Sequence, residues 1–297
     1  MIRFIKYNEI DLTRWDRCII ESLQGLPYAH STYLSALEVK WDGLIMGDYD
    51  AVAALPWHRN RIIKSLYTPY SVQQLGWLSA EPLPADAEKT LITYIHTHYF
   101  RYHYALNYSF GGQPFTDILP AGNLVLDLEK EFPDLEKKFS PHHRREIHKA
   151  AKQSFLLHKN TTVKEFLPFL QQCWGARFYP LSFIKGGASC LMETMVKEGK
   201  GKIWTVCDER GNICAGLFFI VWQRRLIFLF ASSHADGKKR GAMYFLTEHL
   251  IRAYAGQKIL LDFEGSSIAG IRFFYLGFGA RSQNFYILKG SKFSFNW

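Results

Sequence analysis

The sequence has no long hydrophobic run and no cysteine pattern of a disulfide-stabilised or zinc-stabilised protein. Its longest apolar run, residues 213–222, is too short to span a bilayer, and residues 1–6 contain no apolar segment of signal-peptide length. The five cysteines are odd in number and include no Cys-x-x-Cys pair, which argues against a disulfide framework and against a structural zinc. We therefore expect a cytoplasmic protein without a transmembrane segment.

Candidate metal ligands are also few. His96, His98 and His103 lie near one another in the sequence, but their spacing crosses an expected boundary between a helix and a strand. No carboxylate or cysteine accompanies them in this stretch, and zinc sites usually draw on such ligands. The sequence therefore predicts no metal site.

Positive charge and aromatic residues are what the chain has in quantity. The formal net charge is +9 and the pI is about 9.2, which favours an anionic partner such as tRNA, a nucleotide-linked precursor, coenzyme A or an anionic membrane. Aromatic residues make up 16% of the chain, and they either fill a core or line a groove for an extended substrate. Charge alone does not choose among these partners.

The hydrophobic pattern predicts two similar halves, each with three strands, a helix and a further strand. In the first half these elements are expected at residues 43–48, 51–58, 61–67, 84–99 and 103–108, with another strand at 123–128. In the second half they are expected at residues 203–208, 213–222, 226–231, 242–254 and 258–263. The sequence thus predicts an α/β (α+β) protein of two domains, residues 1–130 and 131–297, each a mixed sheet flanked by helices.

An acidic pair ends the last of these strands. Asp262 and Glu264 lie two residues apart, so in an extended strand both carboxylates point to one face. Ser266 and Ser267 follow as candidate N-caps of a short helix. A carboxylate at such a strand end can accept a proton from an attacking amine. The alternative is structural, with one carboxylate capping the helix and the other pairing with a surface base.

A basic segment between a strand and a helix is the second candidate site. Here Ser233, Lys238, Lys239, Arg240 and Gly241 precede an expected helix N-terminus, where backbone N–H groups and the helix dipole favour a phosphate. A solvated charged turn is the simpler alternative. A third candidate is the helix that Ser140 and Pro141 open, on which Arg145 and Lys149 share a basic face that can meet an anionic substrate. A solvated helix face is the alternative there.

Residues 260–288 resemble the closing part of the second domain in the FemAB/FemX group of peptidoglycan aminoacyltransferases, a tandem branch of the GNAT acyltransferase superfamily. The resemblance lies in the strand that ends at Asp262-Phe263-Glu264, the helix that ends at Phe278-Gly279, and the aromatic strand around Tyr286. The basic helix around Arg145 resembles the one that joins the two halves in that family. One difference is that the family's Phe-Lys pair is Phe274-Tyr275 here.

The resemblance implies two tandem GNAT-like domains and an N-acyltransferase. The donor would be a coenzyme A thioester or an aminoacyl-tRNA, with no tightly bound cofactor, and the acceptor would be an amine, such as that of a cell-wall precursor. Asp262 or Glu264 would manage the proton of the amine, and Tyr275 or Tyr286 would donate a hydrogen bond to the oxyanion or protonate the leaving group. Because the family lysine is replaced, a non-catalytic module that binds an anionic ligand or nucleic acid is the alternative.

Overall fold

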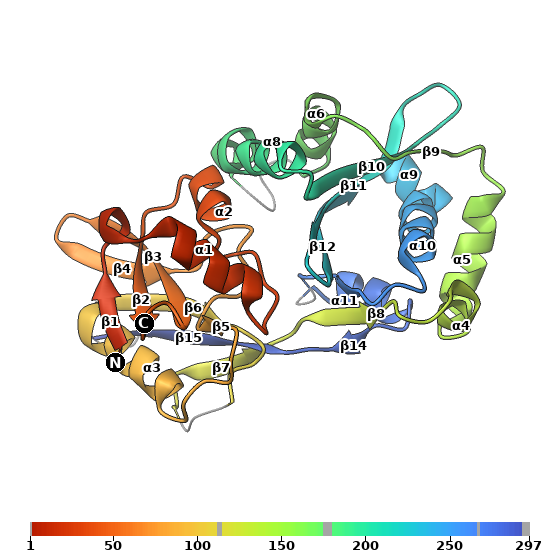
Figure 1. The fold of residues 1–297 in the computed structure, drawn as a ribbon. Helices are drawn as coiled ribbons and strands as arrows, with labels where there is room; N and C mark the ends of the chain where they lie inside the picture. The colour runs from red at the N-terminus through yellow and green to blue at the C-terminus, as the bar shows by residue number, and fades with distance from the viewer. Residues whose placement is uncertain (1, 112–114, 175–179, 266–267, 293–297) are drawn as a thin grey trace. The chain divides into compact units, whose positions relative to one another are not determined.

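The computed structural model describes residues 2–111, 115–174, 180–265 and 268–292 (Figure 1). The chain divides into two compact units. Unit 1 contains the described residues of 1–122 and 283–297, and unit 2 contains those of 123–282. In the described part of the chain, no helix is both long enough and apolar enough to cross a membrane.

Unit 1 is built on a mixed sheet with the strand order β1-β2-β3-β4-β6-β15-β7, and the short strand β5 pairs with β3. The strands are β1 (Ile2–Ile5), β2 (Trp41–Met46), β3 (Ala51–Asn60), β4 (Ile63–Tyr67), β5 (Leu78–Ser79), β6 (Arg101–Leu106), β7 (Ile118–Ala121) and β15 (Phe285–Ser291). The helices are η1 (Tyr7–Glu9), α1 (Leu12–Glu21), α2 (Ser31–Ala36) and α3 (Ala87–His98). Apolar side chains of α3, such as Leu91 and Ile95, are buried, as its spacing predicts.

Unit 2 contains a second mixed sheet with the strand order β14-β8-β13-β12-β11-β10-β9. Its strands are β8 (Leu124–Asp127), β9 (Leu156–His158), β10 (Gly201–Cys207), β11 (Ile213–Trp222), β12 (Arg225–Ser233), β13 (Leu260–Asp262) and β14 (Arg281–Ser282). Its helices are α4 (Phe132–Glu136), α5 (Pro141–Ala151), α6 (Val163–Trp174), α7 (Leu181–Phe183), the π-helical turn η2 (Ile184–Ala188), α8 (Ser189–Lys197), α9 (Ala235–Arg240), α10 (Ala242–Tyr254) and α11 (Ala269–Leu276).

The two units repeat one topology. In unit 1 the antiparallel strands β2, β3 and β4 are followed by α3 and then by β6, which runs parallel to β4. In unit 2 the antiparallel strands β10, β11 and β12 are followed by α10 and then by β13, which runs parallel to β12. The predicted fold class, with two mixed sheets flanked by helices, is confirmed.

The two sheets do not follow the predicted division of the chain into residues 1–130 and 131–297. The strand predicted at residues 123–128 is β8, and it pairs with β13 in the sheet of unit 2 rather than with the first half. Conversely β15, near the end of the chain, pairs with β6 and β7 in the sheet of unit 1. Each sheet therefore takes a strand from the other half of the sequence. Hydrogen bonding between distant strands leaves no local signal in the sequence, so the hydrophobic pattern could not show this exchange.

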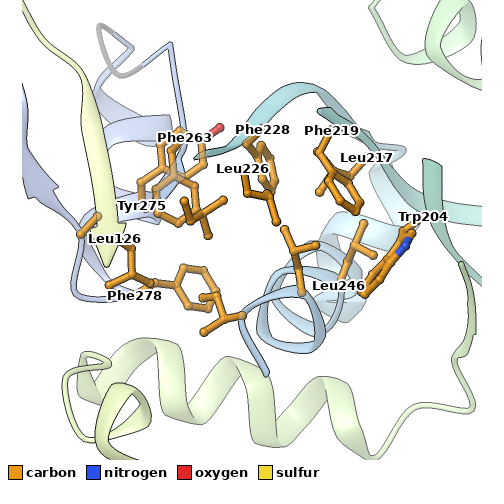
Figure 2. Close-up of a cluster of buried hydrophobic side chains, with 14 of the residues drawn as sticks. Leu126, Trp204, Leu217, Phe219, Leu226, Phe228, Leu246, Phe263, Tyr275 and Phe278 are labelled. Carbon is orange, nitrogen blue, oxygen red and sulfur yellow. The ribbon is translucent and has the colours of Figure 1, made fainter. Parts of the chain in front are cut away.

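The core of unit 2 lies between one face of its sheet and the helices α5, α10 and α11. Figure 2 shows part of this cluster, in which Leu226 and Phe228 of β12 lie near Leu246 of α10. Phe263, which directly follows β13, packs against Phe228 with 5.7 Å between ring centroids. Several aromatic residues of the chain therefore fill this core, which is one of the two roles expected for them.

A buried histidine joins α5 to α11. The side chain of Ser140 caps α5 by accepting a hydrogen bond from the His143 backbone N–H, as the sequence predicts. The His143 ring is fully buried, and its Nε2 donates to the Phe274 carbonyl oxygen at 2.7 Å. Burial is the main cause that lowers the pKa of His143 below its usual value. The ring lies so close to Gly277 that a Cβ atom there would be 1.8 Å from its Cε1 atom.

We expect Gly277→Ala to lower the free energy of unfolding by about 1–3 kcal/mol, because the added methyl group must displace the His143 ring. Gly270→Ala in α11 is the matched control, since a Cβ atom there meets nothing within 4 Å. That change should be neutral or stabilising by up to about 1 kcal/mol, because alanine favours helix. Denaturant unfolding of both variants checks this, and equal stability would show that the His143 contact does not restrict position 277.

Candidate active site

The sheet of unit 2 opens between β12 and β13. β13 runs parallel to β12 but pairs with its first residues alone, from Arg225 opposite Leu260 to Ile227 opposite Asp262. β12 continues to Ser233, so beyond Ile227 no described strand pairs with it on the side of β13. The backbone groups along an unpaired edge can bind an extended ligand as an added strand would.

A β-bulge lies at the start of this open edge. Phe230 pairs with Phe218 and Phe228 pairs with Phe219, which leaves Leu229 as the extra residue of β12. Bulges bend a strand and occur often beside active sites. Trp174 of α6 lies next to the same stretch, with its Nε1 donating to the Ala231 carbonyl oxygen at 3.4 Å. The open edge is therefore a bent strand with an indole beside it.

Asp262 is the last residue of β13, and it is fully buried. Its Oδ2 accepts a hydrogen bond from Arg225 Nη1 at 2.5 Å, in an ion pair whose two side chains are 5% and 0% exposed. Its Oδ1 accepts from Asn123 Nδ2 at 2.8 Å and from the Glu264 backbone N–H at 3.2 Å. A buried carboxylate with these partners is suited to holding β8, β12 and the end of β13 together. Its catalytic role stays a prediction that this geometry does not favour.

Glu264 lies just past the end of β13 and is partly exposed. Its φ is +51°, which is uncommon for a residue other than glycine, and Gly265 follows with φ +45°. The strand is therefore shorter than predicted, and the expectation that both carboxylates share one strand face was wrong, because that alternation requires extended backbone. Backbone strain of this kind often occurs at functional sites. Ser266 and Ser267, the predicted N-caps, lie outside the described residues.

The two predicted tyrosines lie in different units. Tyr275 of α11 is 8% exposed, and its ring stacks on Phe263 with 4.4 Å between centroids, inside the core of unit 2 (Figure 2). Tyr286 of β15 belongs to the sheet of unit 1, where its ring meets Phe110 edge to face at 5.1 Å. A large part of the Tyr275 side chain therefore serves packing. The role of either hydroxyl at an oxyanion or leaving group stays a prediction.

The basic segment predicted as a phosphate loop is a short helix, α9. His234 caps it, since its Nδ1 accepts a hydrogen bond from the Gly237 N–H at 3.0 Å. The backbone N–H of Lys238 bonds to the His234 carbonyl oxygen, and that of Gly241 bonds to the Lys238 carbonyl oxygen. These N–H groups are therefore already used within the segment. Gly241 has φ +80°, and it separates α9 from α10.

The charged side chains of α9 differ in their surroundings. The Arg240 guanidinium donates from Nε to Gln153 Oε1 at 3.1 Å and lies over the Phe155 ring at 4.7 Å. Lys238 and Lys239 are exposed. Ser233, which ends β12 at the open edge, is partly exposed. Of the three predicted cations, the two lysines are the ones whose charge faces solvent.

The structure brings the two predicted basic groups together. Arg145 and Lys149 are exposed on α5, and Lys149 Nζ donates to the Lys239 carbonyl oxygen at 3.1 Å. α5 also packs on the start of α10, where a Cβ atom at Gly241 would lie 3.1 Å from Ala150 Cβ. The exposed lysines Lys149 of α5 and Lys239 of α9 are therefore neighbours on unit 2.

Two of the histidines predicted near residue 100, His96 and His98, have structural contacts. His96 Nε2 and the Tyr102 hydroxyl both bond to Asp117 Oδ2, at 2.8 and 2.9 Å. His98 Nδ1 bonds to the Tyr94 carbonyl oxygen at 2.9 Å. Within the described ranges, no group of three or more His, Cys, Asp or Glu side chains is arranged to hold a metal ion.

Three residues of this site, Arg225, Leu229 and Trp174, were not predicted from the sequence. Arg225 follows the turn between β11 and β12, where a surface charge is the usual expectation, yet it is 4% exposed and pairs with Asp262. The bulge at Leu229 was not predictable, because its sequence does not differ from that of the apolar residues around it in β12. A Trp near a helix end, such as Trp174, suggests core packing first.

Comparison with known proteins identifies the class of protein to which residues 137–267 are similar. A family model described as "Acetyltransferase (GNAT) domain" matches residues 137–267, which include the open edge, Asp262 and Glu264. No curated protein matches the chain. Residues 137–267 therefore form a GNAT acetyltransferase domain, and the chain is of the N-acyltransferase class.

Solved structures place the whole chain in the fold of one group. The chain is similar to FemX, with a TM-score of 0.66, 9% sequence identity and coverage of 97% of each chain. It is also similar to a conserved protein of unknown function from Bacteroides thetaiotaomicron, with a TM-score of 0.65, 11% identity and coverage of 98% and 100%. L-PGS from Bacillus licheniformis is similar over 93% and 90% of the two chains, with a TM-score of 0.56 and 13% identity. The predicted FemAB/FemX-like tandem GNAT fold is confirmed.

Proposed function

We propose that this protein transfers an acyl group from a coenzyme A thioester to an amine, with the donor lying along the open edge of β12. The observation that supports this proposal most is the early end of β13 at Asp262, beyond which no described strand pairs with β12 on that side. The amide-containing arm of such a donor can hydrogen-bond to that edge as a strand does.

Glu264 is the residue we assign to proton transfer. It follows β13 at the opening, is partly exposed, and has a strained backbone. The amine nitrogen attacks the thioester carbonyl carbon, a C–N bond forms, and the C–S bond breaks. The amine loses a proton to the Glu264 carboxylate, and the departing thiolate takes up a proton to give the free thiol. Asp262 does not contact substrate in this scheme, because Arg225 and Asn123 already engage it.

Lys238 and Lys239 are the residues we assign to the donor's phosphates. Both side chains are exposed on α9, which begins two residues after the open edge ends at Ser233. The N-terminus of α10, which follows Gly241 without a side-chain cap, adds the positive end of a helix dipole. Arg240 would contribute less, because its guanidinium is already held by Gln153 and Phe155.

The double variant Lys238→Ala/Lys239→Ala should weaken the binding of a coenzyme A thioester about 10-fold or more, because charge-assisted contacts to phosphate are lost. The difference should shrink at high salt, since salt screens exposed charges. Calorimetric titration at two salt concentrations measures this. Lys185→Ala/Lys197→Ala removes two exposed lysines elsewhere in unit 2 and is the matched control. Equal affinity in both double variants would exclude α9 from the donor site.

The second candidate donor is an aminoacyl-tRNA, which the likeness of the fold to FemX favours. In that case Arg145 and Lys149, which adjoin α9, would meet the backbone phosphates of the nucleic acid. The acceptor amine would then belong to a cell-wall precursor, and the reaction would take place in the cytoplasm. Titration of the same variants with aminoacyl-tRNA separates the two donors, because tRNA binding should depend on Arg145 and Lys149 as well as on the lysines of α9.

A further inference from the structure

Helix α11 exposes apolar side chains that its role in the core does not explain. Phe273 is 57% exposed and Leu276 is 41% exposed, and Ile268, which precedes the helix, is 48% exposed. The opposite side of α11 is buried through Tyr275, so the helix presents one apolar face to the core and another to solvent. Neighbouring exposed apolar residues of this kind often mark an interaction surface.

The exposed apolar side chains of α11 lie beside the basic face of α5. The Phe273 ring lies 5.6 Å from the ring of His142, the second residue of α5. On a helix, Arg145, Lys149 and Lys152 lie on the same side as His142, and all three cations are exposed. The carboxylate of Glu146, also on α5, lies 3.9 Å from Lys149 Nζ, and its side chain is 27% exposed. Unit 2 therefore presents a row of cations that ends at exposed apolar side chains.

We propose that this surface docks on an anionic lipid bilayer. Cations beside exposed apolar side chains suit a membrane interface, where lysine and arginine meet anionic headgroups and apolar side chains enter the acyl boundary. A nucleic acid would use the cations and could stack a base on Phe273, but Leu276 and Ile268 offer no aromatic face for stacking. The bilayer accounts for both parts of the surface. Docking involves no acyl transfer, so it does not depend on the proposed reaction.

Co-sedimentation of the full chain with vesicles tests the docking. Binding is expected to vesicles of phosphatidylcholine mixed with phosphatidylglycerol, and not to vesicles of phosphatidylcholine alone. The variant Arg145→Glu/Lys149→Glu/Lys152→Glu should lower the partition coefficient by about 100-fold or more, since each cation contributes roughly 5-fold near an anionic surface. Phe273→Ser/Leu276→Ser should lower it by about 10-fold with the charge unchanged.

Lys164→Glu/Lys185→Glu/Lys197→Glu is the control, because it reverses three exposed lysines elsewhere in unit 2 and changes the net charge equally. Its partition coefficient should fall by less than about 5-fold through the long-range effect of net charge. Thermal melting of each variant shows whether it is folded. The proposal would be overturned if the parent did not bind anionic vesicles at low salt, or if the two triple variants lost vesicle binding equally. It would also be overturned if, in a parallel titration with RNA, Arg145→Glu/Lys149→Glu/Lys152→Glu lost RNA binding but kept vesicle binding.

Discussion

Replacement of Glu264 by glutamine is expected to lower the turnover of acyl transfer by roughly 100-fold or more, with little change in stability. The amide keeps the size of the side chain but cannot accept the proton of the attacking amine, and a positioned acid or base contributes on this scale. Donor binding should be retained, because the phosphates are assigned to Lys238 and Lys239. Steady-state transfer of a labelled acyl group to an amine measures the effect.

A control variant separates proton transfer from a structural effect. Glu209→Gln, in the exposed turn between β10 and β11, should keep parental turnover. Thermal melting of both variants shows whether each is folded. Turnover within about threefold of the parent in the folded Glu264→Gln protein would remove Glu264 from the proton transfer.

Loss of the Asp262 carboxylate should have a different effect, on stability. Asp262→Ala leaves the Arg225 guanidinium buried without its carboxylate partner, and removal of one member of a buried ion pair costs about 3–5 kcal/mol of unfolding free energy. The double variant Asp262→Ala/Arg225→Met should recover much of that loss, because it also removes the buried charge. Denaturant unfolding of the parent and the two variants measures both values.

These two carboxylates can thus be told apart by experiment. If Asp262 serves the fold, the stability loss of its alanine variant depends on Arg225, and the two-residue change is more stable than the single change. A double variant that is as unstable as Asp262→Ala would show that the ion pair is not what Asp262 contributes. A stable Asp262→Ala protein that has lost turnover would instead support the catalytic role predicted for it from the sequence.

The sequence predicts the elements of this fold better than their assembly. Periodicity located β10, β11, β12 and α10 closely, because a packed helix face and buried strands leave a regular apolar pattern. The exchange of β8 and β15 between sheets was not predictable, since strand pairing depends on hydrogen bonds between residues distant in the sequence. The same limit applies to Arg225, whose partner Asp262 lies on a neighbouring strand.

For the candidate site, the sequence predicts which residues are involved but not what each of them does. The strand-end acids, the basic segment and the basic helix could all be located from residue types alone. Their roles depended on geometry, since the left-handed φ of Glu264 separates it from Asp262, and α9 uses its own N–H groups where a phosphate loop would leave them open. The open edge of β12 follows from the lengths of two parallel strands, and strand ends are the least certain part of any prediction from sequence.

The most direct test of the account is a single-turnover reaction of the purified parent protein with an acyl-labelled coenzyme A thioester and a panel of amines. We expect labelled amide and free coenzyme A thiol to form in equal amounts, and we expect Glu264→Gln to slow both by roughly 100-fold. If labelled amide forms from aminoacyl-tRNA alone, the donor proposed here is wrong. If no donor gives amide with any amine, acyl transfer at the open edge of β12 is contradicted.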